Sequence, residues 1–280
     1  MRLKDILVHL DGAERSETRL RVAADLARRH EAHLTAVNVI DVVSPFVLAG
    51  DAGGAVLAEL MEGMRRDALA EASRVEAAFR ERLRLDGIAG GWRLVEGIAR
   101  TQVALHARYA DLVVVGQEES NAGDPPVSAV AEHALFASGR PVLVVPAAGR
   151  PETVGRRVLV GWNASREAAR AVNDALPVIA RAEATTVLAA DPRHGSRGHG
   201  EEPGADIALH LARHGLKVGV DRIAAGDIDV ADLLLNRAAE LSADLLVVGA
   251  YGHSRLREVV LGGVTRTLLR QTTVPVLMSH

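Results

Sequence analysis

The chain repeats one apolar segment almost letter for letter, once in each half. Residues 110–116 read Ala-Asp-Leu-Val-Val-Val-Gly, and residues 243–249 read Ala-Asp-Leu-Leu-Val-Val-Gly. A Pro-Val-Leu segment at 141–143 likewise returns at 275–277, in the same order relative to the first segment. A repeat of roughly 130 to 150 residues has the length of a domain and is far longer than a solenoid unit. The sequence therefore predicts two copies of one domain.

A short linker separates the two copies. Residues 147–151 read Ala-Ala-Gly-Arg-Pro, a small-residue segment with a proline that is typical of a boundary. We place the first domain at 1–148 and the second at 152–280. In each half, apolar runs of strand length alternate with segments of helical period, which predicts right-handed crossovers and a mainly parallel sheet. The predicted fold class is α/β, with two tandem five-stranded sheets flanked by helices.

Two of the predicted strands would lie at sheet edges. The runs at 142–145 and 276–278 are apolar throughout, and an uncovered apolar edge promotes aggregation. Pairing these strands with each other covers both, so we expect an internal pseudo-dimer within one chain. Whether this unit associates further into a homodimer stays open.

Two segments of the first half have the apolar spacing of amphipathic helices. In the segment 16–30, Leu20, Ala23, Ala24 and Ala27 recur at helical spacing, with Arg and Glu expected on the other face. The segment 55–85 has the pattern of a long amphipathic helix, with Leu60 and Met64 among the side chains expected to point inward.

Composition excludes several classes of partner. The 280 residues include 33 Lys and Arg against 36 Asp and Glu, a formal net charge of −3, so bulk charge gives no attraction to nucleic acid. Cysteine is absent, which excludes disulfides and thiolate metal sites. No apolar run approaches the roughly 18 residues of a membrane span, and the N-terminus does not read as a signal peptide. We expect a cytoplasmic protein that binds neither nucleic acid nor membrane.

A glycine-rich segment follows the second copy of the repeated strand. Gly249, Gly252, Gly262 and Gly263 have the spacing Gly-x2-Gly-x9-Gly-Gly, and a helix is predicted from Val264 onward. The first N–H groups of a helix lack internal partners, so this arrangement turns donors toward an anion. Neither GxxxxGK[ST] nor GxGxxG is present, which argues against a P-loop or a dinucleotide fold. The segment predicts a cradle for the phosphates of an adenine nucleotide. The simpler alternative is a turn that lets a helix pack closely on the sheet.

This spacing, the duplication and the acidic turn Asp11-Gly12 after the first strand together resemble the universal stress protein family, whose motif is Gly-x2-Gly-x9-Gly-(Ser/Thr). The resemblance covers the whole chain. It implies a five-stranded α/β sandwich in each half, like that of the adenine nucleotide alpha hydrolases. It also implies ATP or AMP as ligand, with or without Mg, although some members bind no nucleotide and act through partner contacts. The phosphate and ribose contacts that it implies fall on Gly249, Gly252, Gly262, Gly263, Val264 and Thr265.

Two positions depart from the family pattern. Asn163 stands where the family has an Asp near the adenosine end, so a group that both donates and accepts replaces a pure acceptor. Gly263 replaces the Ser or Thr and removes one hydroxyl donor. His253, together with Arg255 and Arg257, is a further candidate for phosphate contact, against the alternative of a solvated loop charge.

The first half departs further. Gly116 is followed by Gln-Glu-Glu, Asp124 lies within the same loop, and Ser128-Ala129 stands in place of the glycine pair. Three carboxylates in such a loop oppose phosphate binding. We expect that this half does not bind ATP in the family's manner.

We find no set of side chains with the pattern of a catalytic or metal site. The loop with His194 and His199 is interpreted as polar surface, and His9 as a buried histidine within a strand. No nucleophile, base and acid occur together, so no catalytic residue is assigned and hydrolysis of ATP would at most be weak. The leading hypothesis is a stress-response protein whose C-terminal half binds ATP or AMP and acts through conformational or partner changes. The alternatives are an interaction module with vestigial sites and a slow ATPase; protein partners stay unidentified.

Overall fold

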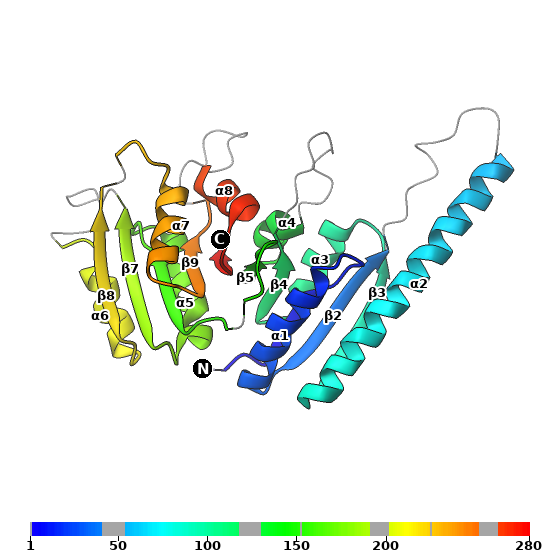
Figure 1. Cartoon of the computed structure of the whole chain (residues 1–280), viewed down its shortest axis with the longest axis horizontal. Coiled ribbons are helices and arrows are strands. Elements are labelled where there is room, and N and C mark those ends of the chain that lie inside the picture. The colour runs from blue at the N-terminus through cyan, green and yellow to red at the C-terminus, as the bar shows by residue number, and fades with distance from the viewer. Residues whose placement is uncertain are drawn as a thin grey trace.

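The structure is a computed structural model of the chain. It describes residues 2–40, 54–117, 130–151, 153–190, 202–224, 226–251 and 263–280. Strands and helices alternate through both halves and form one long, three-layered molecule (Figure 1).

Each half begins and ends with a strand of the central sheet. The described elements of the first half are β1 (Asp5–His9), α1 (Ser16–His30), β2 (His33–Ile40), α2 (Gly54–Asp86), β3 (Gly90–Glu96), α3 (Ala99–Ala107), β4 (Leu112–Gly116), α4 (Val130–Ala137) and β5 (Val142–Val145). Those of the second half are β6 (Arg157–Gly161), α5 (Arg166–Ile179), β7 (Ala184–Ala190), α6 (Ala205–Arg213), β8 (Val218–Ile223), α7 (Val230–Glu240), β9 (Leu245–Gly249), α8 (Gly263–Gln271) and β10 (Val276–Ser279).

The described strands form a single sheet of 10 strands, in the order β3-β2-β1-β4-β5-β10-β9-β6-β7-β8. All neighbours pair in parallel except β5 and β10, which are antiparallel. In that pair Val144 lies opposite Val276, and Val142 lies opposite Met278. The predicted pairing of the two edge strands is therefore confirmed. The two predicted five-stranded sheets are the halves of one continuous sheet, because this pairing joins them.

Alternating side chains of the strands reach two separate apolar layers. Along β1, Ile6 and Val8 lie in one layer and Leu7 in the other, as the two-residue period of a strand requires. The first layer also holds buried residues of α1, α2, α5 and α6, and the second those of α3, α4, α7 and α8. Helices thus cover both faces of the sheet, which is the arrangement expected for a buried parallel sheet.

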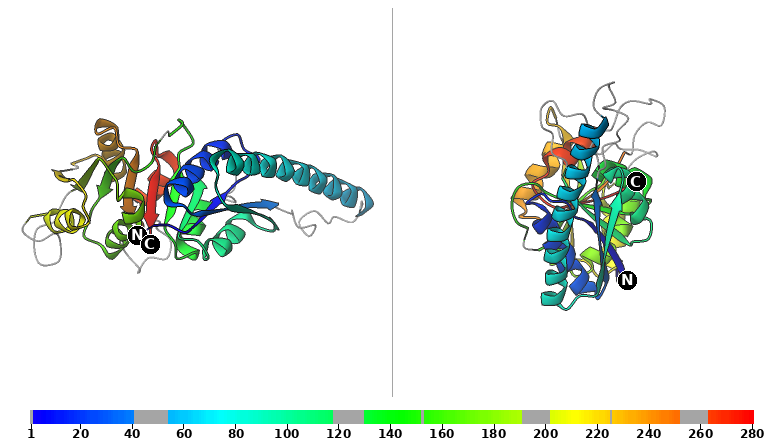
Figure 2. Two further views of the ribbon diagram at one scale, coloured as in Figure 1. Left: turned by 90° about the horizontal axis from the view of Figure 1, so that it is seen from below. Right: turned by 90° about the vertical axis from the view of Figure 1, so that its right-hand side faces the viewer.

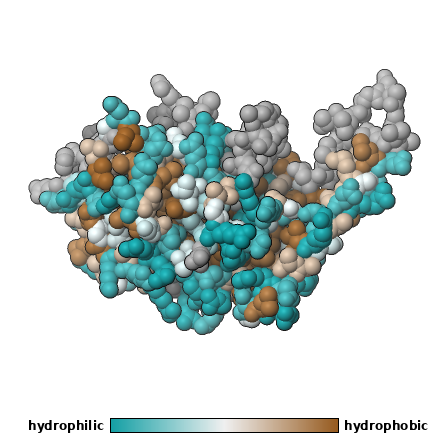
Figure 3. All heavy atoms as spheres, in the orientation of Figure 1, coloured by the Kyte–Doolittle hydropathy of each residue, from teal (hydrophilic) through white to brown (hydrophobic). Residues whose placement is uncertain are grey.

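Helix α2 extends past the sheet (Figure 2). Leu60 and Met64, in its first part, are 56% and 52% exposed, so the prediction that they point inward was wrong. The helix meets the core only farther along, where Ala72 and Phe79 are buried. Apolar surface is visible toward the outer end of this helix in Figure 3. No helix of the described ranges is both long enough and apolar enough to cross a membrane.

Candidate functional site

Each half has one candidate binding position, at the carboxyl ends of two neighbouring parallel strands. Strands β1 and β4 are parallel neighbours in the first half, and β6 and β9 are parallel neighbours in the second. Their carboxyl ends lead to Asp11 and Gly116 in one half and to Asn163 and Gly249 in the other. Ligands of open α/β sheets bind beyond such carboxyl ends.

Gly249 is a glycine because the start of α5 lies against it. A Cβ atom at this position would lie 2.8 Å from the Cα atom of Ala168 and closer still to the backbone of Glu167. Real Cβ atoms essentially never approach so closely, and backbone cannot move aside as a flexible side chain can. At Gly249 the structure thus supports the simpler alternative, a glycine that lets a helix pack closely on the strand end.

Asn163 closes a turn at the end of β6. Its Oδ1 accepts a hydrogen bond of 3.1 Å from the backbone N–H of Ser165, and Ala164 between them has a φ of 56°. Asp11 closes the equivalent turn, because its Oδ1 accepts a hydrogen bond of 3.1 Å from the N–H of Ala13. The exchange of Asp for Asn therefore keeps the acceptor that shapes the turn. It changes the other end of the side chain from a carboxylate oxygen to an amide donor.

Thr265 joins the two ends of the glycine-rich segment. Its Oγ1 accepts a hydrogen bond of 3.3 Å from the backbone N–H of Tyr251, and its side chain is buried, with the residue 4% exposed. Val264, beside it, packs against the apolar layer of α7 and α8. Tyr251 has a φ of 62°, in the left-handed region that non-glycine residues rarely adopt. Thr265 thus fixes the point at which the chain leaves β9 relative to the start of α8.

Gly263 is the first residue of α8, and no described atom lies within 4 Å of the position that a Cβ would occupy. The first turn of this helix carries no acidic residue, so its N–H groups meet no carboxylate of their own helix.

Gly252, His253 and Gly262 lie outside the described residues, as do Arg255 and Arg257. The same holds for the acidic loop of the first half and for the loop with His194 and His199. Among the described residues, no group of acidic or histidine side chains could hold a metal ion.

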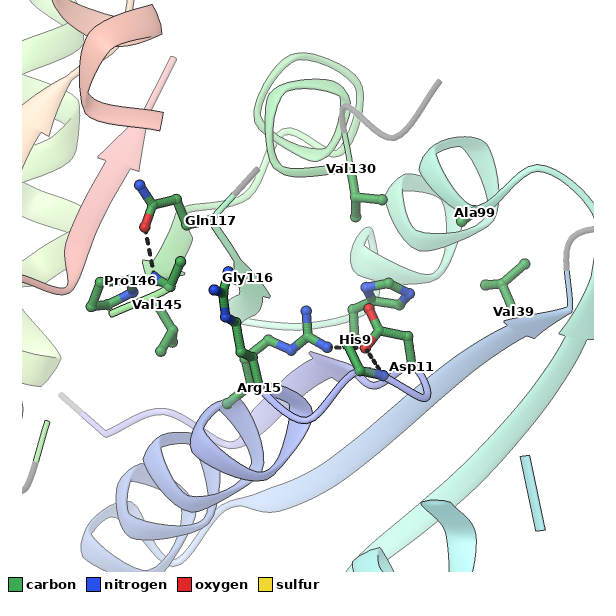
Figure 4. A pocket seen from close by; sticks show the side chains of 13 residues that line it. His9, Asp11, Arg15, Val39, Ala99, Gly116, Gln117, Val130, Val145 and Pro146 are labelled. Atoms are coloured by element: carbon green, nitrogen blue, oxygen red, sulfur yellow. Dashed lines mark hydrogen bonds and ion pairs between the residues drawn. The ribbon is translucent and has the colours of Figure 1, made fainter. Parts of the chain in front are cut away.

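In the first half, the equivalent place is a cavity of about 320 Å³ at the ends of β1 and β4 (Figure 4). Its described lining residues combine charged and polar side chains with small apolar ones: His9, Asp11, Ala13, Arg15, Arg19, Val39, Ala99, Gly116, Gln117, Val130, Val145, Pro146 and Ala147. Three helices begin at this cavity, since Ala13 and Arg15 precede α1, Ala99 opens α3 and Val130 opens α4. The sequence did not predict a ligand-sized cavity here.

A buried arginine distinguishes this cavity from the second half. Arg19 of α1 is 7% exposed, and its Nη2 donates to Oδ1 of Asp11 and to Oγ of Ser16. The Ser16 hydroxyl also donates to Oδ1 of Asp11 at 2.7 Å. The guanidinium lies where a Cβ of Gly116 would be, whereas the start of α5 takes that place at Gly249. The expectation that the arginines of this helix face away from the core was therefore wrong for Arg19.

These groups set the charge at the cavity. Burial lowers the pKa of His9 from 6.5 to about 4, and the nearby positive charge of Arg19 is the second cause of this shift. His9 is therefore neutral at neutral pH, and the prediction that it is buried is confirmed by its 6% exposure. Burial alone would raise the pKa of Asp11, but Arg19, His9 and the hydrogen bonds from Ser16 and Arg19 together lower it. Asp11 is thus a carboxylate paired with a buried cation.

Comparison with known proteins agrees with the duplication. The family model described as "Universal stress protein family" matches residues 2–146 and again residues 155–280. Universal stress protein Slr1230 of Synechocystis is 32% identical over 94 residues, which are 26% of this chain and 32% of that relative. The match thus spans about a third of the relative's length.

Solved structures show a similar fold over almost the whole chain. A universal stress protein from Archaeoglobus fulgidus is 17% identical, with a TM-score of 0.73 over 98% of this chain and 95% of its own. A protein from Pseudomonas aeruginosa described as a putative universal stress protein is 15% identical, with a TM-score of 0.57 over 99% of this chain and 93% of its own. With the family model matched in both halves, the chain belongs to the universal stress protein family as a tandem, two-domain member.

Proposed function

We propose that the second half binds ATP or AMP, with or without Mg, at the glycine-rich segment between β9 and α8. The observation that supports this most directly is the start of α8. Gly263 is the first residue of the helix, no described atom lies within 4 Å of its Cβ position, and the first turn lacks acidic residues. Unpaired N–H groups at such a helix start attract phosphate.

Two further contacts support the same site. Thr265 holds Tyr251 and the helix start together through a hydrogen bond of 3.3 Å, so the segment between them begins and ends at fixed points. Asn163 follows the end of the neighbouring strand β6, and its Oδ1 accepts a hydrogen bond in a turn. In this proposal its amide group is the donor to base or ribose. In this proposal Gly252, His253 and Gly262 contribute the phosphate contacts that the family motif implies, while Gly249 provides the close packing.

The proposed response to the nucleotide is a change in conformation or partner contacts. Tyr251 at the start of the segment contacts α4 of the other half, through its ring and through its hydroxyl. A ligand bound at the segment would thereby act on both halves. We further propose domains at 1–148 and 152–280, a cytoplasmic location, and a chain that can act as one unit or as a homodimer.

The test is calorimetric titration of the full chain with ATP, AMP and GTP, with two variants at Gly263. Gly263→Glu places a carboxylate at the helix start, where no described atom lies within 4 Å of the Cβ position, and Gly263→Gln has the same shape without the charge. We expect binding of an adenine nucleotide to the parent protein and to the Gln variant, and loss of binding in the Glu variant. The absence of heat for every adenine nucleotide with the parent protein would remove the proposal.

The second candidate function is an interaction module that binds no nucleotide. The exposed Leu60 and Met64 on the part of α2 beyond the sheet favour it, because exposed apolar side chains often lie at contact surfaces. Mass spectrometry of the denatured protein separates the two candidates. A co-purified adenine nucleotide supports the first, and its absence together with failed titration supports the second.

A further inference from the structure

The cavity of the first half contains groups that call for a ligand of its own. We propose that this cavity binds a small organic anion, with one anionic group held by Arg15 and Arg19 and an apolar body against the opposite wall. The site differs from the glycine-rich segment of the second half, since the described residues of its lining all lie within 9–147. The proposal does not depend on nucleotide binding in the second half.

The charges of the lining favour an anion. The described lining contains the guanidinium groups of Arg15 and Arg19 and the carboxylate of Asp11, whose Oδ1 already accepts from Arg19. His9 adds no charge at neutral pH, because burial lowers its pKa to about 4. The starts of α1, α3 and α4 also face this cavity, and Ile98, which caps α3, offers no side-chain hydrogen bond to it. Helix starts carry partial positive charge, which adds to that of the arginines.

Arg19 supplies an observation that is independent of helix ends. Its side chain is 8% exposed, and its Nε is a buried donor with no hydrogen-bond partner among the described residues. Buried donors in folded proteins are nearly always paired, and an unpaired donor on a charged group is costly. An anionic oxygen in the cavity is the partner that would satisfy this group.

The opposite wall selects an apolar body. Val39 from β2, Ala99 from α3 and Val130 from α4 lie across the cavity from His9 and Asp11 (Figure 4). Val145, the last residue of β5, and Pro146 add apolar surface beside Gln117, on the side away from Val39 and Ala99 (Figure 4). The volume of about 320 Å³ is at the lower end of pockets that hold small molecules. A single ring or a short branched chain with one carboxylate or phosphate has this combination of size and polarity.

The same residues argue against a nucleotide in this half. The Arg19 guanidinium lies over Gly116, so the strand end does not present open backbone to a phosphate chain. Oδ1 of Asp11 already accepts hydrogen bonds from Ala13, Ser16 and Arg19. Side-chain guanidinium groups would therefore hold the anion, in place of the backbone of a glycine-rich loop.

The test uses two probes, benzoate and phenyl phosphate, titrated calorimetrically into the full chain that carries Gly263→Glu. That background silences the proposed nucleotide site, so the two proposals fail separately. We expect at least one probe to bind with a stoichiometry of one at millimolar or lower concentration, and ATP and AMP not to bind. The two probes distinguish a carboxylate from a phosphate as the preferred anionic group.

Two variants identify the cavity as the place of binding. Arg15 is exposed at the cavity, so Arg15→Gln should fold normally and weaken the preferred probe about tenfold or more, the effect of losing one charged hydrogen bond. Ala99→Phe fills the cavity without changing its charge and should block binding. Arg213→Gln, at an exposed arginine of α6, is the matched control and should leave affinity unchanged. The proposal is overturned if neither probe binds, or if binding persists unchanged in both Arg15→Gln and Ala99→Phe.

Discussion

The ring of Tyr251 packs against the ring of Phe136, with centroids 4.2 Å apart, although the two residues belong to different halves of the chain. Tyr251 begins the glycine-rich segment of the second half, and Phe136 lies on α4 of the first. The Tyr251 hydroxyl also donates to Oε1 of Glu132 on the same helix, at 3.4 Å. His280 at the chain end completes the cluster, with its ring 5.0 Å from that of Phe136. Helix α4 opens at Val130, which lines the first-half cavity, so this contact links the two candidate sites.

Phe136→Leu should weaken the link between the halves at little cost to the core. Phe136 is 44% exposed, so its burial contributes modestly, and aromatic pairs add about 0.5–1.5 kcal/mol beyond burial. A double-mutant cycle with Tyr251→Leu, read by denaturant unfolding, should give a coupling energy in that range. Leu105→Ala is the control, since Leu105 on α3 is 45% exposed and lies in no described ring pair. Additive effects of Phe136→Leu and Tyr251→Leu would show that the ring contact contributes nothing.

Alanine at two glycines of the motif should have opposite effects. Gly249→Ala places a methyl group against the backbone of Glu167 and Ala168, and overpacking of this kind costs about 1–3 kcal/mol or more. Gly263→Ala adds a methyl group that meets no described atom within 4 Å. It should stabilise the protein by about 0.4–1 kcal/mol, because alanine lowers the entropy of the unfolded chain. Thermal unfolding of both variants measures the difference. Equal melting temperatures would mean that α5 can shift away from Gly249.

Thr265→Val should destabilise the protein and weaken nucleotide binding together. The change keeps the shape but removes the acceptor of the Tyr251 N–H, and an unpaired buried donor costs about 1–3 kcal/mol. Thr265→Ser keeps the hydroxyl and is the matched control. Denaturant unfolding and ATP titration of both variants provide the measurement. A Val variant with parental stability would show that water replaces the hydroxyl as the acceptor.

His9 should make stability depend on pH between about 6.5 and 4. Its pKa is 6.5 in the unfolded chain and about 4 in the folded protein, so the unfolded chain binds more protons in this window. Stability is therefore present above pH 6.5 and is lost as the pH falls toward 4. The shift corresponds to about 3 kcal/mol.

His9→Gln measures this contribution. His30 and His106 have lowered pKa values as well, so the wild-type slope includes more than one group. The difference between the wild-type and His9→Gln slopes of unfolding free energy against pH isolates His9. If the two slopes coincide across the window, His9 is either solvated in the folded protein or paired when protonated.

Much of the fold was predictable because it depends on local pattern and on covered edges. The repeated strands at 110–116 and 243–249 predicted the duplication. The apolar runs at 142–145 and 276–278, expected at sheet edges that must be covered, predicted that these two strands pair. What pattern alone did not give is the continuity of the sheet, which follows only once that junction is a regular ladder. The outward position of Leu60 and Met64 was missed because the helical period fixes a face but not where the sheet beneath it ends.

The site was predicted less completely, since it depends on which side chain fills a given space. Arg19 follows Arg15 by four residues and precedes Ala23 by four, so its spacing already placed it on the apolar stripe of α1. Its charge led to the opposite assignment. The packing of α5 against Gly249 likewise could not be predicted from the spacing of glycines. A glycine is required both where a helix packs closely and where backbone contacts a phosphate, so the sequence does not distinguish the two. The predictions at Gly252, His253 and Gly262 remain predictions.

The antiparallel junction of β5 and β10 also fixes the ratio of the two halves at one to one. Because one polypeptide carries both partners of this pairing, dilution cannot separate them and no exchange with another copy is needed to complete the sheet. A cell that makes more or less of this protein changes the number of paired halves but never the ratio between them. The ligand specificity of each half can therefore change independently during evolution. The two halves remain paired, because the chain fixes their effective concentration.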